Sequence, residues 1–172
     1  MMLGSLILPR EAGEDAADRL LAQTAARLAA EGVPVAGAVQ AARRSPEGAR
    51  SEMRLALLAP PGGEVVISQS LGGASTGCRL DPGALEEAAQ RVADALPGAR
   101  LLLLSKFGKQ EAAGRGFRPV VAEAMGLGLP VLVSVSPDVA AEFAAFTEGM
   151  AEAVAPEDAE DWCRAALREA GE

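Results

Sequence analysis

The 172-residue sequence contains no histidine, and aromatic residues make up only 3% of it. The absence of histidine excludes histidine general bases, histidine metal sites and every Ser-His or Cys-His catalytic pair. No apolar run approaches the roughly 20 residues that span a bilayer, and the N-terminal segment lacks the basic region of a signal peptide. A net charge of −8 argues against general binding of nucleic acids or anionic membranes.

Cysteine is also scarce, because the chain has only Cys78 and Cys163, far apart. They form neither a metal-ligand spacing nor the disulfide framework of a small secreted domain. We therefore expect a cytoplasmic protein without a metal site. Cys78 is interpreted as a small core residue rather than a reactive thiol or a soft metal ligand.

Apolar runs alternate with amphipathic helical patterns along the chain, which favours an α/β fold. Strands are expected over residues 4–8, 33–39, 101–104, 131–136 and, at an edge, 151–155. Helices are expected over residues 15–31, 81–96, 117–125, 138–147 and 157–170. Two runs at 53–59 and 64–70 flank Pro-Pro-Gly-Gly and predict a β-hairpin. The whole chain, 1–172, is thus expected to form a single three-layer α/β domain, with a mainly parallel open sheet and an inserted antiparallel hairpin.

Ligands of such sheets bind outside the carboxyl ends of the strands, and three loops are expected there. The first reads PREAGEDAADRL, at the position where a nucleotide-binding protein would carry GxxxxGK[ST]. It has one glycine, no lysine and four acidic residues. Acids at a helix N-terminus suit the helix dipole and repel phosphate, so this loop cannot cradle a triphosphate as a P-loop does.

The third loop, SKFGKQEAAGRGFR, concentrates positive charge in an acidic protein. Its cations are Lys106, Lys109, Arg115 and Arg118, and Glu111 is the one acid among them. The chain has fourteen arginines and only these two lysines, which suggests that the compact charge of lysine is needed here. The loop is interpreted as an oxyanion or phosphate site. The alternative is a lysine paired with Glu111 beside solvated arginines.

The second loop, SLGGASTGCRLD, adds neutral groups next to a helix start. Ser75, Thr76 and Gly77 offer hydroxyl and backbone donors that could form an anion-binding nest, and Arg79 could complete the pocket. Asp81, as the N-cap of the following helix, competes for the same backbone amides.

Three segments carry a resemblance to a known family: VPVAGAVQ, LGGASTGCRLDPGALEEA and SKFGKQEAAGRGFRPVVAEAMGLGLPVLVSV. They resemble an uncharacterised bacterial family of unknown function that is associated with molybdenum transport. That family is distantly similar to small P-loop nucleoside triphosphatases of the cancer-related type. The resemblance covers about residues 3–167 and implies a P-loop-NTPase-like fold with a degenerate P-loop.

The resemblance also implies what this chain has lost. Aligned on Phe107-Gly108-Lys109 and Glu111, the acidic pair of the triphosphatases falls on Ser105 and Lys106. The first of those acids normally holds Mg²⁺ and the second helps to position water. A hydroxyl and a cation in their place argue against Mg-NTP as a ligand and favour a metal-free anion.

These observations lead to one hypothesis and two alternatives. The hypothesis is a non-catalytic protein that binds a small anion, either an oxyanion such as molybdate or tungstate or a phosphorylated small molecule. It predicts that Lys109→Ala abolishes binding without unfolding the protein. One alternative is a nucleoside triphosphatase-like enzyme with an unorthodox site. The other is an interaction module for a molybdate-transport or metalloenzyme-assembly protein. Edge strands and exposed apolar helix faces are compatible with a homodimer.

Overall fold

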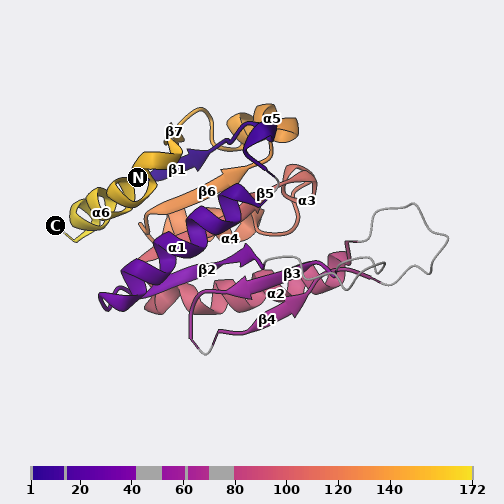
Figure 1. Cartoon of the computed structure of the whole chain (residues 1–172), viewed down its shortest axis with the longest axis horizontal. Coiled ribbons are helices and arrows are strands. Elements are labelled where there is room, and N and C mark those ends of the chain that lie inside the picture. The colour runs from indigo at the N-terminus through magenta and orange to yellow at the C-terminus, as the bar shows by residue number, and fades with distance from the viewer. Residues whose placement is uncertain (1, 14, 42–51, 61, 70–79, 172) are drawn as a thin grey trace.

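The computed structural model describes residues 2–13, 15–41, 52–60, 62–69 and 80–171 of the chain (Figure 1). A seven-stranded sheet in the order β4-β3-β2-β5-β6-β1-β7 forms its centre. The strands are β1 (Leu3–Leu6), β2 (Val35–Gln40), β3 (Arg54–Leu57), β4 (Glu64–Val66), β5 (Leu101–Phe107), β6 (Val131–Val135) and β7 (Glu152–Ala153). All seven overlap segments that the sequence predicts to be strands.

Five neighbouring strands of this sheet run parallel, and a hairpin of two further strands extends it at one edge. β5 pairs in parallel with β2 and β6, and β1 pairs in parallel with β6 and β7. β3 pairs antiparallel with β2 and with β4. The inserted antiparallel hairpin is therefore confirmed, and it occupies one edge of the sheet.

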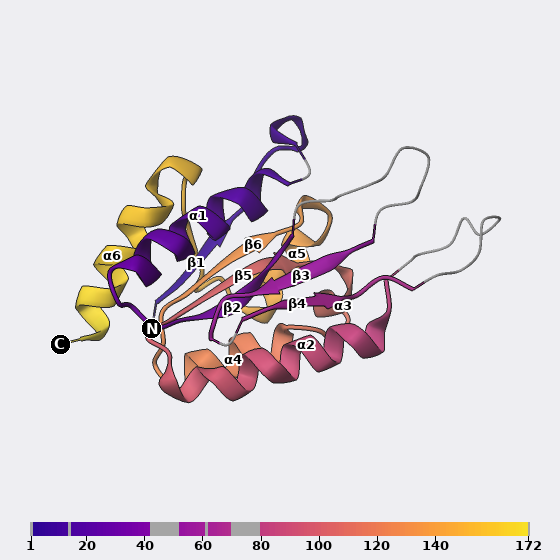
Figure 2. The same ribbon diagram turned by 60° about the horizontal axis from the view of Figure 1, so that its bottom comes forward.

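Helices cover both faces of the sheet. They are α1 (Ala16–Ala30), α2 (Pro82–Ala95), α3 (Lys109–Ala112), α4 (Arg118–Gly126), α5 (Ala140–Phe146) and α6 (Ala159–Ala170), with short 3₁₀ turns η1 (Arg10–Ala12), η2 (Leu96–Gly98), η3 (Pro137–Val139) and η4 (Pro156–Asp158). Figure 2 shows α1 and α6 on one side of the strands and α2 and α4 on the other. The three-layer α/β architecture is confirmed, and it is compatible with a P-loop-NTPase-like fold.

The central strands are apolar throughout because both of their faces are covered. Along β5, Leu102 and Leu104 belong to the core beneath α2 and α4, whereas Leu101 and Leu103 belong to the core beneath α1 and α6. All four are fully buried. This alternation is the period-2 geometry of a strand, and it places the centre of the hydrophobic core on β5.

The main departure from the sequence prediction lies just after residue 104. Ser105, Lys106 and Phe107 were expected to open a loop, but they continue β5, and α3 follows within the segment expected to be a loop. Pairing with β6 persists through Ser105–Ser134 and resumes at Phe107–Val135 after a shift of register. The peptide bond between Ser105 and Lys106 is cis. Long-range pairing with β6, which local sequence does not reveal, therefore extends the strand.

The carboxyl ends of the parallel strands meet at one edge of the molecule, at the right of Figure 1, near α3 and α5. The two termini lie at the opposite edge. From β1 the chain crosses by way of α1 past β6 and β5 to β2, whereas from the neighbouring strand β6 it leads by way of α5 past β1 to β7. The connections after these two adjacent strands therefore run in opposite directions, which is where open α/β sheets hold their ligands.

Candidate functional site

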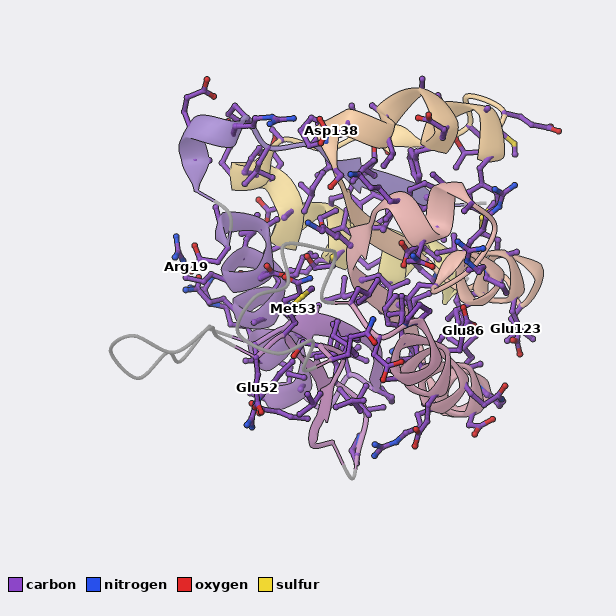
Figure 3. The ribbon with its side chains drawn as sticks, turned by 90° about the vertical axis from the view of Figure 1, so that its right-hand side faces the viewer. Arg19, Glu52, Met53, Glu86, Glu123 and Asp138 are labelled. Atoms are coloured by element: carbon purple, nitrogen blue, oxygen red, sulfur yellow. The ribbon has the colours of Figure 1, made fainter. Side chains whose placement is uncertain are left out.

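A cavity of about 660 Å³ opens at this edge. Its walls come from the carboxyl ends of β1, β2, β5 and β6, from the start of α1 and from η3. Figure 3 looks onto this edge, with Asp138 above the strand ends and Arg19 on the outer side of α1. A cavity of this size is typical of small-molecule sites.

Lys106 supplies positive charge to the cavity from the end of β5. Its side chain is exposed, whereas its strand neighbours Ser105 and Phe107 are buried. Within the described part of the chain, Lys106 forms no ion pair with an acidic side chain closer than 4.0 Å. Lys106 and Asp18 thus line the same cavity with opposite charges, and Lys106 lowers the pKa of Asp18.

Asp18 is the buried acid of this cavity, on the inner face of α1 and only 7% exposed. Its Oδ1 accepts a hydrogen bond from the backbone N–H of Gln40 at 3.1 Å. Burial raises the pKa of Asp18 above its usual 3.8, while the nearby Ser105 hydroxyl, the Gln40 N–H and the charge of Lys106 oppose the shift.

Two buried hydroxyls continue inward from this carboxylate. Ser134, in β6, donates through Oγ to the Oγ of Ser105, in β5, at 2.8 Å. Both serines line the cavity and are nearly inaccessible, at 4% and 2% exposure. The side chains of Asp18, Ser105 and Ser134 thus give the cavity a polar floor.

Charges at the rim of the cavity are paired. Arg10, in η1, donates to the Asp138 carboxylate of η3, and both side chains are exposed. Asp15, just before α1, accepts from Arg19 one helical turn later, at 2.6 Å. These exposed pairs are screened by water, so the rim contributes less electrostatic bias than Lys106 and Asp18.

The four cations predicted to form one anion site do not converge on this cavity. Only Lys106 is among the described residues that line it. Lys109 is exposed in the first turn of α3, and the Arg115 Nε donates to the side chain of Gln110 at 3.0 Å. The Arg118 guanidinium lies 4.7 Å from the centre of the Phe146 ring.

Glu111 stabilises the segment between β5 and α4 instead of pairing with a lysine, the alternative that the sequence left open. Its carboxylate is 4% exposed and accepts backbone N–H groups from Gly108 at 3.0 Å and from Phe117 at 3.3 Å. Burial raises the pKa of Glu111, and the backbone hydrogen bonds oppose that shift. The role of this carboxylate is to hold the chain as it turns back towards the sheet.

The second predicted group of ligands, Ser75, Thr76, Gly77 and Arg79, lies outside the described residues, as does Cys78. Asp81, which does lie inside, caps α2 by accepting from the backbone N–H groups of residues 83 and 84. Its expected role as the N-cap is confirmed.

Sequence reasoning overlooked Asp18 and Ser134, although a pattern in the sequence points to each. Asp18 precedes Leu21, Ala25 and Leu28 at helical spacing, so an acid occupies the buried face of α1. Ser134 is the one polar residue inside the apolar strand Val131–Val135. A polar side chain at a core position must find a partner. Asp18 finds the backbone N–H of Gln40, and Ser134 finds the hydroxyl of Ser105.

Among the described residues, no helix is both long and apolar enough to cross a membrane. No group of three or more acidic or cysteine side chains there converges so as to hold a metal ion.

Comparison with known proteins gives two matches. The profile of a family described as "Protein of unknown function (DUF2478)" matches residues 7–162. The "Molybdenum import ATP-binding protein ModC 2" of Bradyrhizobium diazoefficiens is 36% identical over 138 residues. That match covers 80% of this chain but only 15% of the relative. No solved structure matches the chain.

Proposed function

Because the chain belongs to the DUF2478 family, whose description assigns no activity, we propose a function from the cavity: non-catalytic binding of a small anion. Lys106 supplies the positive charge, and the hydroxyls of Ser105, Ser134 and Ser136 supply neutral partners. The ligand is an oxyanion such as molybdate or tungstate, or a phosphorylated small molecule. The observation that carries the proposal is the position of Lys106, free of an acidic partner among the described residues and next to buried hydroxyls.

The partial relative supports an anionic ligand in two ways. Its name refers to molybdenum import and to ATP binding, and molybdate and ATP are both anions. The matched segment is a small part of that protein, so neither role transfers directly. Of the two kinds of anion, the chemistry of this cavity favours one that binds without Mg²⁺.

A bound triphosphate would have to lie at the start of α1, where P-loop proteins cradle phosphate. Here that region carries the carboxylates of Asp15 and Asp18. Both would repel a triphosphate, with its several negative charges, more strongly than a small anion held beside Lys106, and the connection lacks the lysine of a P-loop. These features favour binding without nucleotide hydrolysis.

The test is calorimetric titration of the protein with phosphate, sulfate, molybdate, tungstate and ATP, with and without Mg²⁺. We expect saturable binding of an anion and a loss of about 10- to 100-fold in affinity for Lys106→Ala, the usual contribution of a charged hydrogen bond. Lys109→Ala is the matched control, since the same side chain is removed three residues away, outside the described lining of the cavity.

Each outcome is informative. Wild-type affinity in the Lys106→Ala variant contradicts the cavity assignment, and loss of binding in Lys109→Ala restores the site predicted from sequence. Release of inorganic phosphate from Mg-ATP favours the alternative of a nucleoside triphosphatase-like enzyme. No binding of any anion favours an interaction module, and the search then moves to transport and metalloenzyme-assembly proteins.

A further inference from the structure

The two ion pairs at the rim of the cavity differ in where the arginine lies. Arg10 and Asp138 pair with each other, and both line the cavity. Asp15 also lines it, but its partner Arg19 lies on the outer side of α1 and is not among the described lining residues (Figure 3). Of these two arginines, only Arg10 therefore has access to a ligand in the cavity.

The fold places Arg10 and Lys106 on opposite sides of one strand end. Arg10 lies in η1, after β1, and Lys106 lies near the end of β5, while β6 runs between these two strands. Since neighbouring strands are about 4.8 Å apart, β1 and β5 end about 10 Å from each other. Two long cationic side chains thus flank the end of β6, and Asp138 follows that strand in η3.

The bond between Arg10 and Asp138 shows what the Arg10 guanidinium binds. A guanidinium group has five N–H donors and no acceptor, and its planar fork fits a carboxylate or a phosphate group equally well. The Asp138 carboxylate accepts from the Arg10 Nη2 although the two residues are 128 positions apart in the sequence. Asp138 therefore occupies the place that an anionic ligand would take on Arg10.

This ion pair can be exchanged at low cost. The side chain of Arg10 is 74% exposed and that of Asp138 is 57% exposed. Exposed pairs contribute little to stability, because water solvates both charges and the side chains lose rotamer freedom when they pair. An anion that is already held beside Lys106 would have to overcome only this small contribution in order to bind Arg10.

We propose that Arg10 is a second anion-binding residue of the cavity and that Asp138 is its internal competitor, which the ligand displaces. The inference rests on the proposed function, because it assumes that the cavity binds an anion beside Lys106. In the free protein, the Asp138 carboxylate holds the Arg10 guanidinium at the rim. In the complex, the ligand takes that guanidinium and the Asp138 carboxylate turns towards water.

The first test uses two single variants and inorganic phosphate as the probe, with binding measured by calorimetry. Asp138→Asn keeps the shape of the side chain and removes the competing charge, so phosphate affinity is expected to rise about two- to fivefold. Arg10→Ala removes the contact with the ligand and is expected to lower the affinity at least about threefold. Unchanged affinity in Arg10→Ala overturns the inference.

The double variant Arg10→Ala/Asp138→Asn separates competition from general electrostatics. Removing a negative charge from the rim favours an anion whether or not Arg10 takes part. If Asp138 competes for Arg10, however, the gain from Asp138→Asn must be larger when Arg10 is present. We expect this difference to be about two- to fivefold, the contribution of the displaced ion pair. Equal gains in the two backgrounds overturn the inference.

The matched control is the same cycle made with Asp15→Asn and Arg19→Ala. Asp15 lines the cavity as Asp138 does, and its carboxylate pairs with an arginine in the same way. Because Arg19 lies outside the described lining, it stays paired when a ligand binds, and the two substitutions are expected to act additively on phosphate affinity. A coupling as large as that between Arg10 and Asp138 overturns the inference.

Lys106→Ala distinguishes failure of this inference from failure of the proposed function. If Lys106→Ala lowers phosphate affinity while the Arg10 and Asp138 cycle is additive, the cavity binds the anion without Arg10, and only the inference is overturned. If the wild-type protein binds neither phosphate nor molybdate, the proposed function and the inference are both overturned.

Discussion

Asp18 and Glu111 are both buried carboxylates near the carboxyl edge of the sheet, yet their surroundings differ. Asp18 accepts from one backbone N–H, and it lines the cavity together with Ser105 and Lys106. Glu111 is held by two backbone N–H groups and is not among the described residues that line the cavity. Burial raises the pKa of both.

Burial and a shifted pKa therefore do not distinguish a binding group from a structural one. Perturbed pKa values cluster at functional sites, but structural networks perturb them too. The partners and the adjoining space make the distinction here. Glu111 bonds to the backbone that it organises, whereas Asp18 lines an open volume next to Lys106. Four predictions test this division, from the largest effect to the smallest.

Glu111→Ala is expected to lower the free energy of unfolding by about 2–5 kcal/mol, because it leaves two buried N–H donors without a partner. Urea unfolding measures the loss. Glu123→Ala, an exposed glutamate on α4, is the control and should stay within about 0.5 kcal/mol of the wild type. A Glu111→Ala variant as stable as this control would contradict the structural role of Glu111.

Gly116→Ala tests the same segment through the backbone position that packs against the Glu111 carboxylate. Gly116 has φ of +60°, and a Cβ there would lie 2.5 Å from the Glu111 Oε1. We expect a loss of about 1–3 kcal/mol from the left-handed backbone and the clash together. Gly128→Ala is the matched control: its φ is +74°, and a Cβ there meets nothing within 4 Å. Equal stability of the two variants would show that Glu111 moves aside freely.

Asp18→Asn is expected to raise the melting temperature at neutral pH. The raised pKa means that the folded protein binds a proton at Asp18 more readily than the unfolded chain, so ionisation weakens folding above the folded-state pKa. The gain over the wild type should shrink as the pH falls through that pKa and vanish below the ordinary value of 3.8.

Glu111→Gln gives the contrast for this pH series. Its amide NH₂ must face one of two backbone N–H donors, so the variant should melt below the wild type at neutral pH. Thermal unfolding from about pH 4 to pH 8 compares the two variants. A melting temperature of Asp18→Asn below that of the wild type at neutral pH contradicts the assignment of burial as the dominant effect on Asp18.

Arg118→Ala has the smallest expected effect, a loss of about 0.5–1 kcal/mol from the contact with the Phe146 ring. Denaturant unfolding together with anion titration separates two roles for Arg118. Its position over the ring predicts reduced stability with unchanged affinity. Reduced affinity would instead return Arg118 to the anion site that the sequence predicts.

Much of the fold could be predicted because it depends on local patterns. The apolar run at Leu101–Leu104, the helical spacing of Leu21, Ala25 and Leu28, and the Pro-Pro-Gly-Gly turn each identify an element without knowledge of its neighbours. The extension of β5 through Phe107 could not be found this way, since it depends on pairing with a strand about 30 residues away.

The site was predicted only in part, for the same reason. The sequence alone determined that the connection after β1 cannot cradle a triphosphate, that histidine chemistry is excluded, and that the lysines lie near the carboxyl edge of an α/β sheet. Only the tertiary structure decided which lysine lines the cavity. It also placed Asp18, Ser105 and Ser134, which come from three different elements, on the wall of one cavity. The hydrogen bond between Ser105 and Ser134, 29 residues apart, depends on how the strands pack, and local sequence does not encode that distance.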